Sequence, residues 1–172
     1  DHNVGQILQA LEDSGLTART IVIFTSDHGD NVGARGMWGK SNFYEESVAI
    51  PLIISGTEVP TGQCATPVNL IDCAPTILEH FRLRDAEIES RPGKSLYAIA
   101  AEPDEPERVT FSEYHAAGSA TAGFMLRKGC WKYTYYVGHE PELFGLEGDP
   151  EELTDLAGQS EHAATQAGLH QE

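Results

Sequence analysis

The polar segment Ser26-Asp27-His28-Gly29-Asp30 contains residue types that can carry chemistry. Asp27 offers a hard carboxylate oxygen and His28 an imidazole nitrogen, and together they could hold a divalent cation. Gly29 lets the backbone turn sharply beside them. Lys40 follows thirteen residues after Asp27. A lysine beside a cation suits an anionic substrate with several oxygens, such as a sulfate or phosphate ester.

Each of these residues also has an ordinary structural interpretation. Asp27 and Asp30 could form Asx turns, His28 could be a loop histidine, and Lys40 could be a solvated surface lysine. Spacing and local chemistry alone leave both interpretations open.

The elements around this segment are those of an α/β protein. The run from Thr20 to Thr25 is continuously apolar and β-branched, which predicts a strand buried on both faces, as in a parallel sheet. The polar segment begins where this strand ends, and open α/β sheets bind ligands outside the carboxyl ends of their strands. A second strand is predicted over Ser47–Ser55, with Pro51 at an edge or entry position.

Helices are predicted before and after these two strands in the sequence. The first runs through Val4, Ile7, Leu8 and Leu11 and ends at Ser14-Gly15. A later one begins at Thr66-Pro67 and restarts at Asp72, because Pro75 is tolerated only in a first helical turn. Because the chain opens on a helix already under way, we expect it to be a piece of a longer protein.

The second half of the chain predicts a small antiparallel sheet. An acidic, proline-spaced connector covers residues 98–107. The elements predicted beyond it are strands at Arg108–Tyr114, Gly123–Lys128 and Trp131–Val137, a turn at Lys128-Gly129, a short strand at Leu143-Phe144, and a last helix opened by Asp149-Pro150.

Composition excludes some classes of function. The chain has 27 acidic and 11 basic residues, a net charge of −16, so a nucleic-acid partner is not expected. No apolar stretch is long enough for a transmembrane segment. The three cysteines form no Cys-x-x-Cys pair, which suggests neither a disulfide framework nor a zinc site. The compartment, whether cytoplasmic or periplasmic and secreted, stays open.

Four stretches carry a resemblance to a known family. They are Thr20–Asp30, Gly36–Ser47, Ile50–Ile54 and a closing motif from Leu143 to Leu156. Together they resemble the C-terminal part of a formylglycine-dependent (type I) sulfatase of the alkaline phosphatase superfamily. They also resemble the related phosphonate and phosphate monoester hydrolases.

The resemblance implies a fold and a domain division. Residues 1–97 correspond to the C-terminal half of the α/β catalytic domain, an alkaline-phosphatase-like parallel-sheet sandwich. Residues 98–107 are the connector, and residues 108–172 form a small antiparallel β subdomain with a terminal helix.

The resemblance also implies site roles. Asp27 and His28 match the pair that completes the metal site, and Lys40 matches the lysine that contacts the charged oxygens of the ester. Many sulfatases have Asn in place of His28 and bind calcium, whereas imidazole favours manganese or another transition metal, so Ca²⁺ and Mn²⁺ both stay open. His115 is a further candidate for substrate binding, although a surface histidine at a strand end is the competing interpretation.

The family's nucleophile is a formylglycine made from the cysteine of a Cys-x-Pro-x-Arg motif. Cys73-Ala74-Pro75-Thr76 begins such a motif, but Ile77 stands in place of the arginine, and we interpret Cys73 as a buried, small apolar residue. We therefore expect no nucleophile in this chain, and expect the formylglycine and two more metal ligands to precede Asp1. The chain alone is expected to be inactive.

Three functions follow from these expectations. The leading one is part of a sulfatase that hydrolyses sulfate esters, with a small anionic ester as its substrate. The alternatives are part of a phosphonate or phosphate monoester hydrolase, and a non-catalytic truncated or assembly module. A homo-oligomer is compatible with all three.

Overall fold

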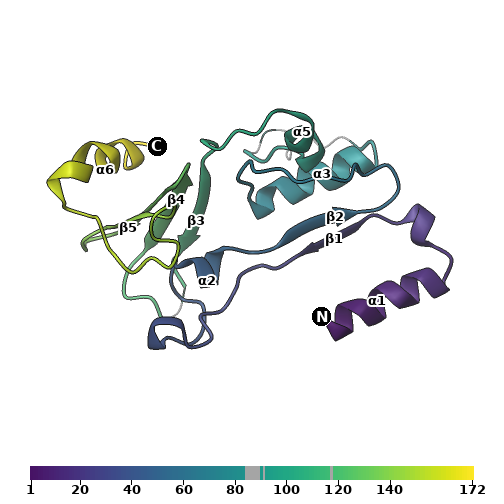
Figure 1. The fold of residues 1–172 in the computed structure, drawn as a ribbon, viewed down its shortest axis with the longest axis horizontal. Coiled ribbons are helices and arrows are strands. Elements are labelled where there is room, and N and C mark those ends of the chain that lie inside the picture. Colours follow the sequence, from purple (N-terminus) through teal and green to yellow (C-terminus); the bar gives the residue numbers. More distant parts are fainter. Residues whose placement is uncertain (84–89, 91, 117) are drawn as a thin grey trace.

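Figure 1 shows the computed structural model, which describes residues 1–83, 90, 92–116 and 118–172. Two β sheets organise the described chain. A two-stranded sheet contains β1 (Val22–Thr25) and β2 (Leu52–Ser55), and a four-stranded sheet contains β3 to β6. Within the predicted segment 1–97, residues 84–89 and 91 lie outside the described residues.

The strand expected from Thr20 to Thr25 forms as β1, but its surroundings differ from the expectation. β1 pairs with β2 in the antiparallel direction, with Phe24 opposite Ile53. These two side chains are 39% and 58% exposed, so β1 is not buried on both faces within this chain. A β-branched run predicts that a segment forms a strand, but it does not predict the direction of the neighbouring strand. Sheets that are otherwise parallel often contain an antiparallel strand.

The segment predicted as one strand from Ser47 to Ser55 divides into two elements. Its start belongs to α2 (Glu45–Val48), a single helical turn, and only its end is the strand β2. Pro51 lies between the two, directly before β2, where it costs no sheet hydrogen bond. The prediction of a strand at Ser47 is therefore wrong, because the local turn is fixed by contacts with distant residues.

Two of the helices predicted in the first half are confirmed. α1 (His2–Asp13) ends at Ser14 as predicted, and Gly15 follows with φ +69°. α3 (Cys73–His80) begins after Asp72, with Pro75 in its first turn. The apolar periodicity and the turn residues were sufficient signals for both.

The helix predicted to begin at Thr66-Pro67 does not form. The Thr66 hydroxyl instead accepts a hydrogen bond from the Glu105 N–H at 2.8 Å. Short helical turns lie at Thr17–Arg19 and Leu70–Asp72, and α5 (Leu96–Ala101) takes in the first residues of the predicted connector.

The fully buried carboxylate of Asp72 fixes the α3 region. It accepts hydrogen bonds from the N–H groups of Asn69 and Lys94, both at 2.8 Å, and from the Arg108 guanidinium at 2.9 Å. Arg108 also donates to the Pro67 carbonyl at 2.6 Å. One carboxylate thus joins the start of α3, the approach to α5 and the approach to the second sheet.

The second sheet confirms the sequence prediction closely. Its strands run in the order β3-β4-β5-β6, and each neighbouring pair is antiparallel. The strands are β3 (Thr110–Tyr114), β4 (Gly123–Lys128), β5 (Trp131–Tyr136) and β6 (Glu142–Gly145). The terminal helix α6 (Ala163–Leu169) begins later than predicted. Asp149 forms a turn instead of opening a helix, because its carboxylate accepts the Thr154 N–H at 2.7 Å.

The two faces of this sheet have different partners. On one face, Leu126, Tyr133 and Leu143 pack with Leu169 of α6 to form the hydrophobic core. On the opposite face, the Lys132 side chain reaches Glu45 of α2. Figure 1 shows α2 beside this sheet. The second sheet is therefore the layer between α6 and the polar segment. Among the described residues, no helix has the length and apolar character needed to cross a membrane.

Replacing Asp72 with Asn tests this anchor in the complete protein. The substitution leaves the Arg108 guanidinium without its carboxylate, and breaking a buried pair typically costs about 3–5 kcal/mol of unfolding free energy. The exposed Lys94–Glu102 pair supplies the control, since Lys94→Met should cost about 1 kcal/mol or less. Urea unfolding of both variants measures the difference, and equal losses would contradict the role of Asp72.

Candidate functional site

The segment that leaves β1 is folded tightly on itself. The Ser26 hydroxyl donates to the His28 carbonyl at 2.6 Å, and the His28 N–H donates to Asp27 Oδ1 at 3.0 Å. These bonds orient Asp27 and His28 locally. The Asp27 side chain is 79% exposed, so its carboxylate faces outward from the end of β1.

The imidazole of His28 is oriented by its own backbone neighbour. Nδ1 lies 2.8 Å from the Gly29 carbonyl, which can only accept, so Nδ1 carries the proton. Nε2 then keeps its lone pair, lies 3.4 Å from Asp27 Oδ2 and contacts the Lys40 ammonium. A backbone carbonyl that holds one ring nitrogen is the usual support for a metal-ligating histidine.

Electrostatics at Asp27 favour its ionised form. Desolvation acts to raise the pKa of Asp27, but it is outweighed by electrostatic interactions with His28 and Lys40 and by hydrogen bonds from backbone N–H groups. The net shift lowers the pKa of Asp27, which keeps the carboxylate available as an anionic ligand.

The donor set fits part of a metal site. A carboxylate oxygen and the unprotonated Nε2 of the imidazole converge from adjacent residues, a combination suited to a divalent cation. Within the described ranges, however, no three His, Cys, Asp or Glu side chains gather closely enough to hold a metal ion. Asp27 and His28 can therefore supply two ligands of such a site.

Gly29 brings this segment against α2. Its N–H donates to the Ser47 carbonyl at 2.8 Å, and a Cβ built on Gly29 would lie only 2.0 Å from the Glu46 carbonyl oxygen. No side chain fits at this position without moving backbone. The requirement for glycine here comes from close approach, not from a positive φ.

Asn31 closes the loop that presents Lys40. It is 3% exposed, and its amide donates to the Gly39 carbonyl at 2.5 Å and to the Ser47 hydroxyl at 3.1 Å. The Asn31 N–H also donates to the Gly39 carbonyl, and Asp30 Oδ1 accepts the Gly39 N–H at 3.2 Å. Lys40 follows directly, so its backbone starts from a fixed point.

The structure brings three of the predicted site residues together: Asp27, His28 and Lys40. The fourth, His115, has other contacts. It pairs with Glu113 at 3.3 Å and packs edge-on against Phe124, at a ring separation of 5.0 Å.

Sequence reasoning missed the neighbouring residue Tyr114. Its hydroxyl lies 3.1 Å from the hydroxyl of Ser41, directly after Lys40. Side chains alternate between the two faces of a strand, so Tyr114 lies on the face opposite Glu113. This alternation is the sequence feature that could have identified Tyr114. Asn31 was also missed, and nothing in its sequence surroundings marks it.

Cys73 does not have the environment of a reactive thiol. It lies at the start of α3, half-buried, where burial and the Asp72 carboxylate raise its thiol pKa. A raised pKa disfavours the nucleophilic thiolate. This agrees with Cys73 being a packing residue, although it is less buried than the sequence suggests.

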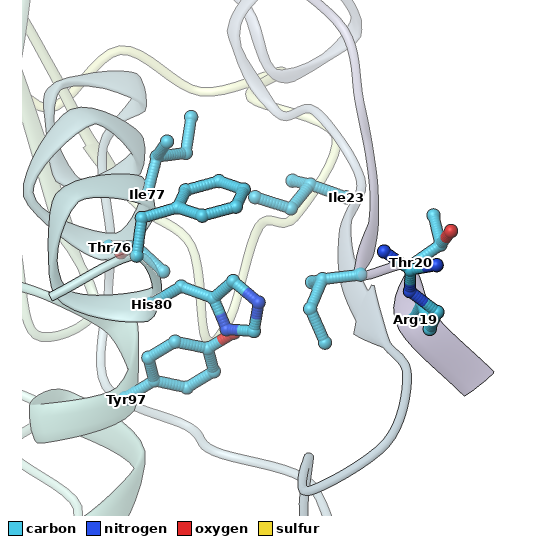
Figure 2. A pocket seen from close by; sticks show the side chains of 9 residues that line it. Arg19, Thr20, Ile23, Thr76, Ile77, His80 and Tyr97 are labelled. Carbon is cyan, nitrogen blue, oxygen red and sulfur yellow. The ribbon is translucent and has the colours of Figure 1, made fainter. Parts of the chain in front are cut away.

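A separate cleft lies between β1 and α3. Figure 2 shows Ile23 facing Ile77, His80 and Tyr97 across it, with Arg19 and Thr20 at one side. The His80 ring lies against Tyr97, with Nδ1 3.5 Å from the Tyr97 hydroxyl. Asp27, His28 and Lys40 do not line this cleft, so it is distinct from the candidate metal site.

Solved structures of other proteins have a fold closely similar to that of this chain. The structure of BT4656 in complex with its substrate D-glucosamine-2-N,6-O-disulfate has a TM-score of 0.84 and 26% identity, covering 99% of this chain and 36% of that one. A phosphonate monoester hydrolase of Agrobacterium radiobacter has a TM-score of 0.78 and 26% identity, covering 97% and 36%. The fold is therefore that of the alkaline-phosphatase-like hydrolases.

Among these hydrolases, the relatives found by sequence comparison are sulfatases. The Sulfatase family model matches residues 1–83. A choline-sulfatase of Rhizobium meliloti (strain 1021) is 36% identical over 172 residues, covering 98% of this chain and 33% of the relative. Arylsulfatase K of Xenopus laevis is also 36% identical, covering 92% and 32%. The chain is thus similar to sulfatases over nearly its whole length, and it spans about a third of the length of these curated relatives.

Gly29→Ala tests the contact that positions the site. The added methyl meets the Glu46 carbonyl oxygen, so the Asp27–His28 segment or α2 must shift and the complete protein should lose stability. Gly5→Ala in α1 is the control, because a Cβ at Gly5 would have nothing within 4 Å, and Ala in a helix is favoured over Gly by roughly 0.5–1 kcal/mol. Thermal unfolding compares the two, and an unchanged melting temperature for Gly29→Ala would refute the contact.

Proposed function

We propose that the protein containing this chain hydrolyses sulfate esters, with this chain supplying two metal ligands and the active-site lysine. The observation that carries the proposal is the convergence of Asp27, His28 and Lys40 at the end of β1. The similarity of the chain to sulfatases supports it. The substrate class we propose is a small anionic ester.

In this reaction the chain's residues would bind and orient the ester. Asp27 and His28 would hold a divalent cation, which polarises a sulfate oxygen when bound. The Gly29 carbonyl accepts a hydrogen bond from Nδ1 of His28, which leaves Nε2 as the nitrogen that would bind the cation. Lys40 places a positive charge beside the ester, where it stabilises the negative charge that grows on the leaving oxygen.

The nucleophile is proposed to come from outside these 172 residues. Cys73 lacks the arginine of the family's motif and has a raised thiol pKa, so it is a poor candidate. We propose a formylglycine, whose hydrate supplies the attacking oxygen. By itself this chain is then expected to be inactive. His115 is kept as a proposed substrate contact, although its ring contacts Glu113 and Phe124 in the structure.

Hydrolysis of a phosphonate or phosphate monoester is the second candidate. Two observations favour it: the similarity to phosphonate monoester hydrolases of known structure, and the histidine at position 28. Rates for matched sulfate and phosphonate esters, measured on the complete protein, discriminate between the two. A clear preference for the phosphonate would replace the leading proposal.

Removing the Asp27 carboxylate tests the metal assignment. Asp27→Ala in the complete protein should abolish turnover and sharply reduce bound metal, because water does not replace an anionic ligand. His28→Asn should lose less metal and shift preference toward Ca²⁺ over Mn²⁺, since an amide oxygen is a harder ligand than imidazole. Metal content is measured by elemental analysis. Full metal occupancy in Asp27→Ala would show that Asp27 is not a ligand.

Replacing Lys40 tests the proposed charge stabilisation. Loss of one fixed electrostatic donor typically lowers kcat by roughly 10²–10³-fold, and Lys40→Ala should fall in this range. Lys40→Arg should recover only part of the rate, because a planar guanidinium does not reproduce a compact ammonium. Circular dichroism checks the fold. A folded Lys40→Ala variant with wild-type kcat would make Lys40 an ordinary surface lysine.

A further inference from the structure

A buried ion-pair network joins the second sheet to the helical turn that follows Lys40. It consists of Lys132 on β5, Glu45 on α2 and Glu152. The Lys132 side chain is 1% exposed, and its ammonium lies 2.6 Å from Glu152 Oε1 and 3.0 Å from Glu45 Oε1. Glu152 has no exposed side-chain surface. We call these three residues the Glu45–Lys132–Glu152 network.

The network contacts the backbone of α2 as well as the Glu45 side chain. The second carboxylate oxygen, Glu152 Oε2, accepts the Glu45 N–H at 2.7 Å. Glu152 itself has φ +52°, a conformation that is costly for a residue with a side chain. The fold holds Glu152 in this conformation, and the carboxylate there bridges Lys132 to the first residue of α2.

Arg35 connects the same carboxylate to the loop between His28 and Lys40. Its guanidinium donates to Glu46 at 2.6 Å, lies 3.7 Å from Glu152 Oε2 and also donates to the Glu151 carbonyl. It packs over the Tyr44 ring at 4.1 Å from the ring centroid. The loop is thus held to the segment around Glu152 from a second direction.

α2 in turn holds both halves of the candidate site. The Ser47 carbonyl accepts the Gly29 N–H, which fixes the Asp27–His28 segment. The Ser47 hydroxyl accepts from Asn31, which also binds Gly39 directly before Lys40. The two halves bind different atoms of Ser47, so a rotation or distortion of α2 would change the position of Lys40 relative to Asp27 and His28.

We propose that Lys132 and Glu152 are positioning residues that hold Lys40 in register with Asp27 and His28 through α2. This inference rests on the proposed function. Buried ion pairs contribute little to stability compared with apolar residues of similar volume, so their stability effect does not explain three charges at this place. The Glu152 carboxylate makes directional contacts with the Glu45 N–H and with Lys132. These contacts fix the position of α2, which an apolar side chain would not do.

The test uses the complete protein and a series of sulfate esters whose alcohols range from poor to good leaving groups. If Lys40 stabilises the leaving oxygen, Lys40→Ala slows poor leaving groups far more than an activated aryl sulfate. Glu152→Gln and Lys132→Met should steepen the same dependence. Misplacement by about 1 Å can cost roughly 10²-fold in rate, so kcat for the poorest leaving group should fall on that scale, with KM nearly unchanged.

Two further variants separate positioning from general stability. Asp72→Asn breaks a buried pair at α3 and should destabilise the protein without changing the leaving-group dependence. The double variant Glu152→Gln/Lys132→Met leaves no unpaired partner in this pair and should fold, yet keep the steepened dependence.

The outcomes distinguish this inference from the proposed function. An unaltered leaving-group dependence in Lys40→Ala would overturn the role of Lys40, and with it the positioning of Lys40 by the network. A steepened dependence in Lys40→Ala but not in the folded network variants would overturn the positioning inference alone. The same steepening in Asp72→Asn would also overturn it, since general destabilisation would then suffice.

Discussion

The hydrogen bond from the Gly29 N–H to the Ser47 carbonyl is the contact on which the site depends. It brings the end of β1 against α2 so closely that the Glu46 carbonyl occupies the space of a side chain at Gly29. Asp27 and His28 precede this contact and Lys40 approaches it from the other side, through Asn31. Residues separated by an irregular loop are thus held to one helical turn. The anionic ester proposed as substrate would require this precision.

The sequence predicted which candidate site residues lie together better than which elements support them. Asp27 and His28 follow a recognisable strand, and the antiparallel strands of the second sheet have regular alternation and clear turns. The mistaken elements at Thr66 and Ser47 depend on contacts outside their own run of sequence. Ser47 begins no strand because α2 is held by Glu152, far away along the chain, through a 2.7 Å bond to the Glu45 N–H. Asp149 opens no helix because its carboxylate is used within a turn. Propensity contains no information on such partners.

The contrast between Tyr114 and His115 shows how one position along a strand decides which surface a residue joins. Chemical reactivity alone favours the histidine as a site residue, but His115 contacts Glu113 and Phe124. Tyr114 extends to Ser41 beside Lys40. The continuous apolar run of β1 was informative in a different way. It describes a strand suited to burial on both faces, while the exposed Phe24 leaves one such surface open within the residues described.

Charge places a final constraint on the site. These 172 residues have a net charge of −16, so their overall field repels an anionic ester instead of steering it inward. At physiological ionic strength exposed charges are screened beyond about 8 Å, which makes the local arrangement decisive. There, Lys40 contacts His28 and faces an exposed Asp27 whose pKa is lowered. A cation at Asp27 and His28 would neutralise that carboxylate and leave the Lys40 charge uncompensated for an anion. Metal binding would therefore be a condition for substrate binding as well as for catalysis.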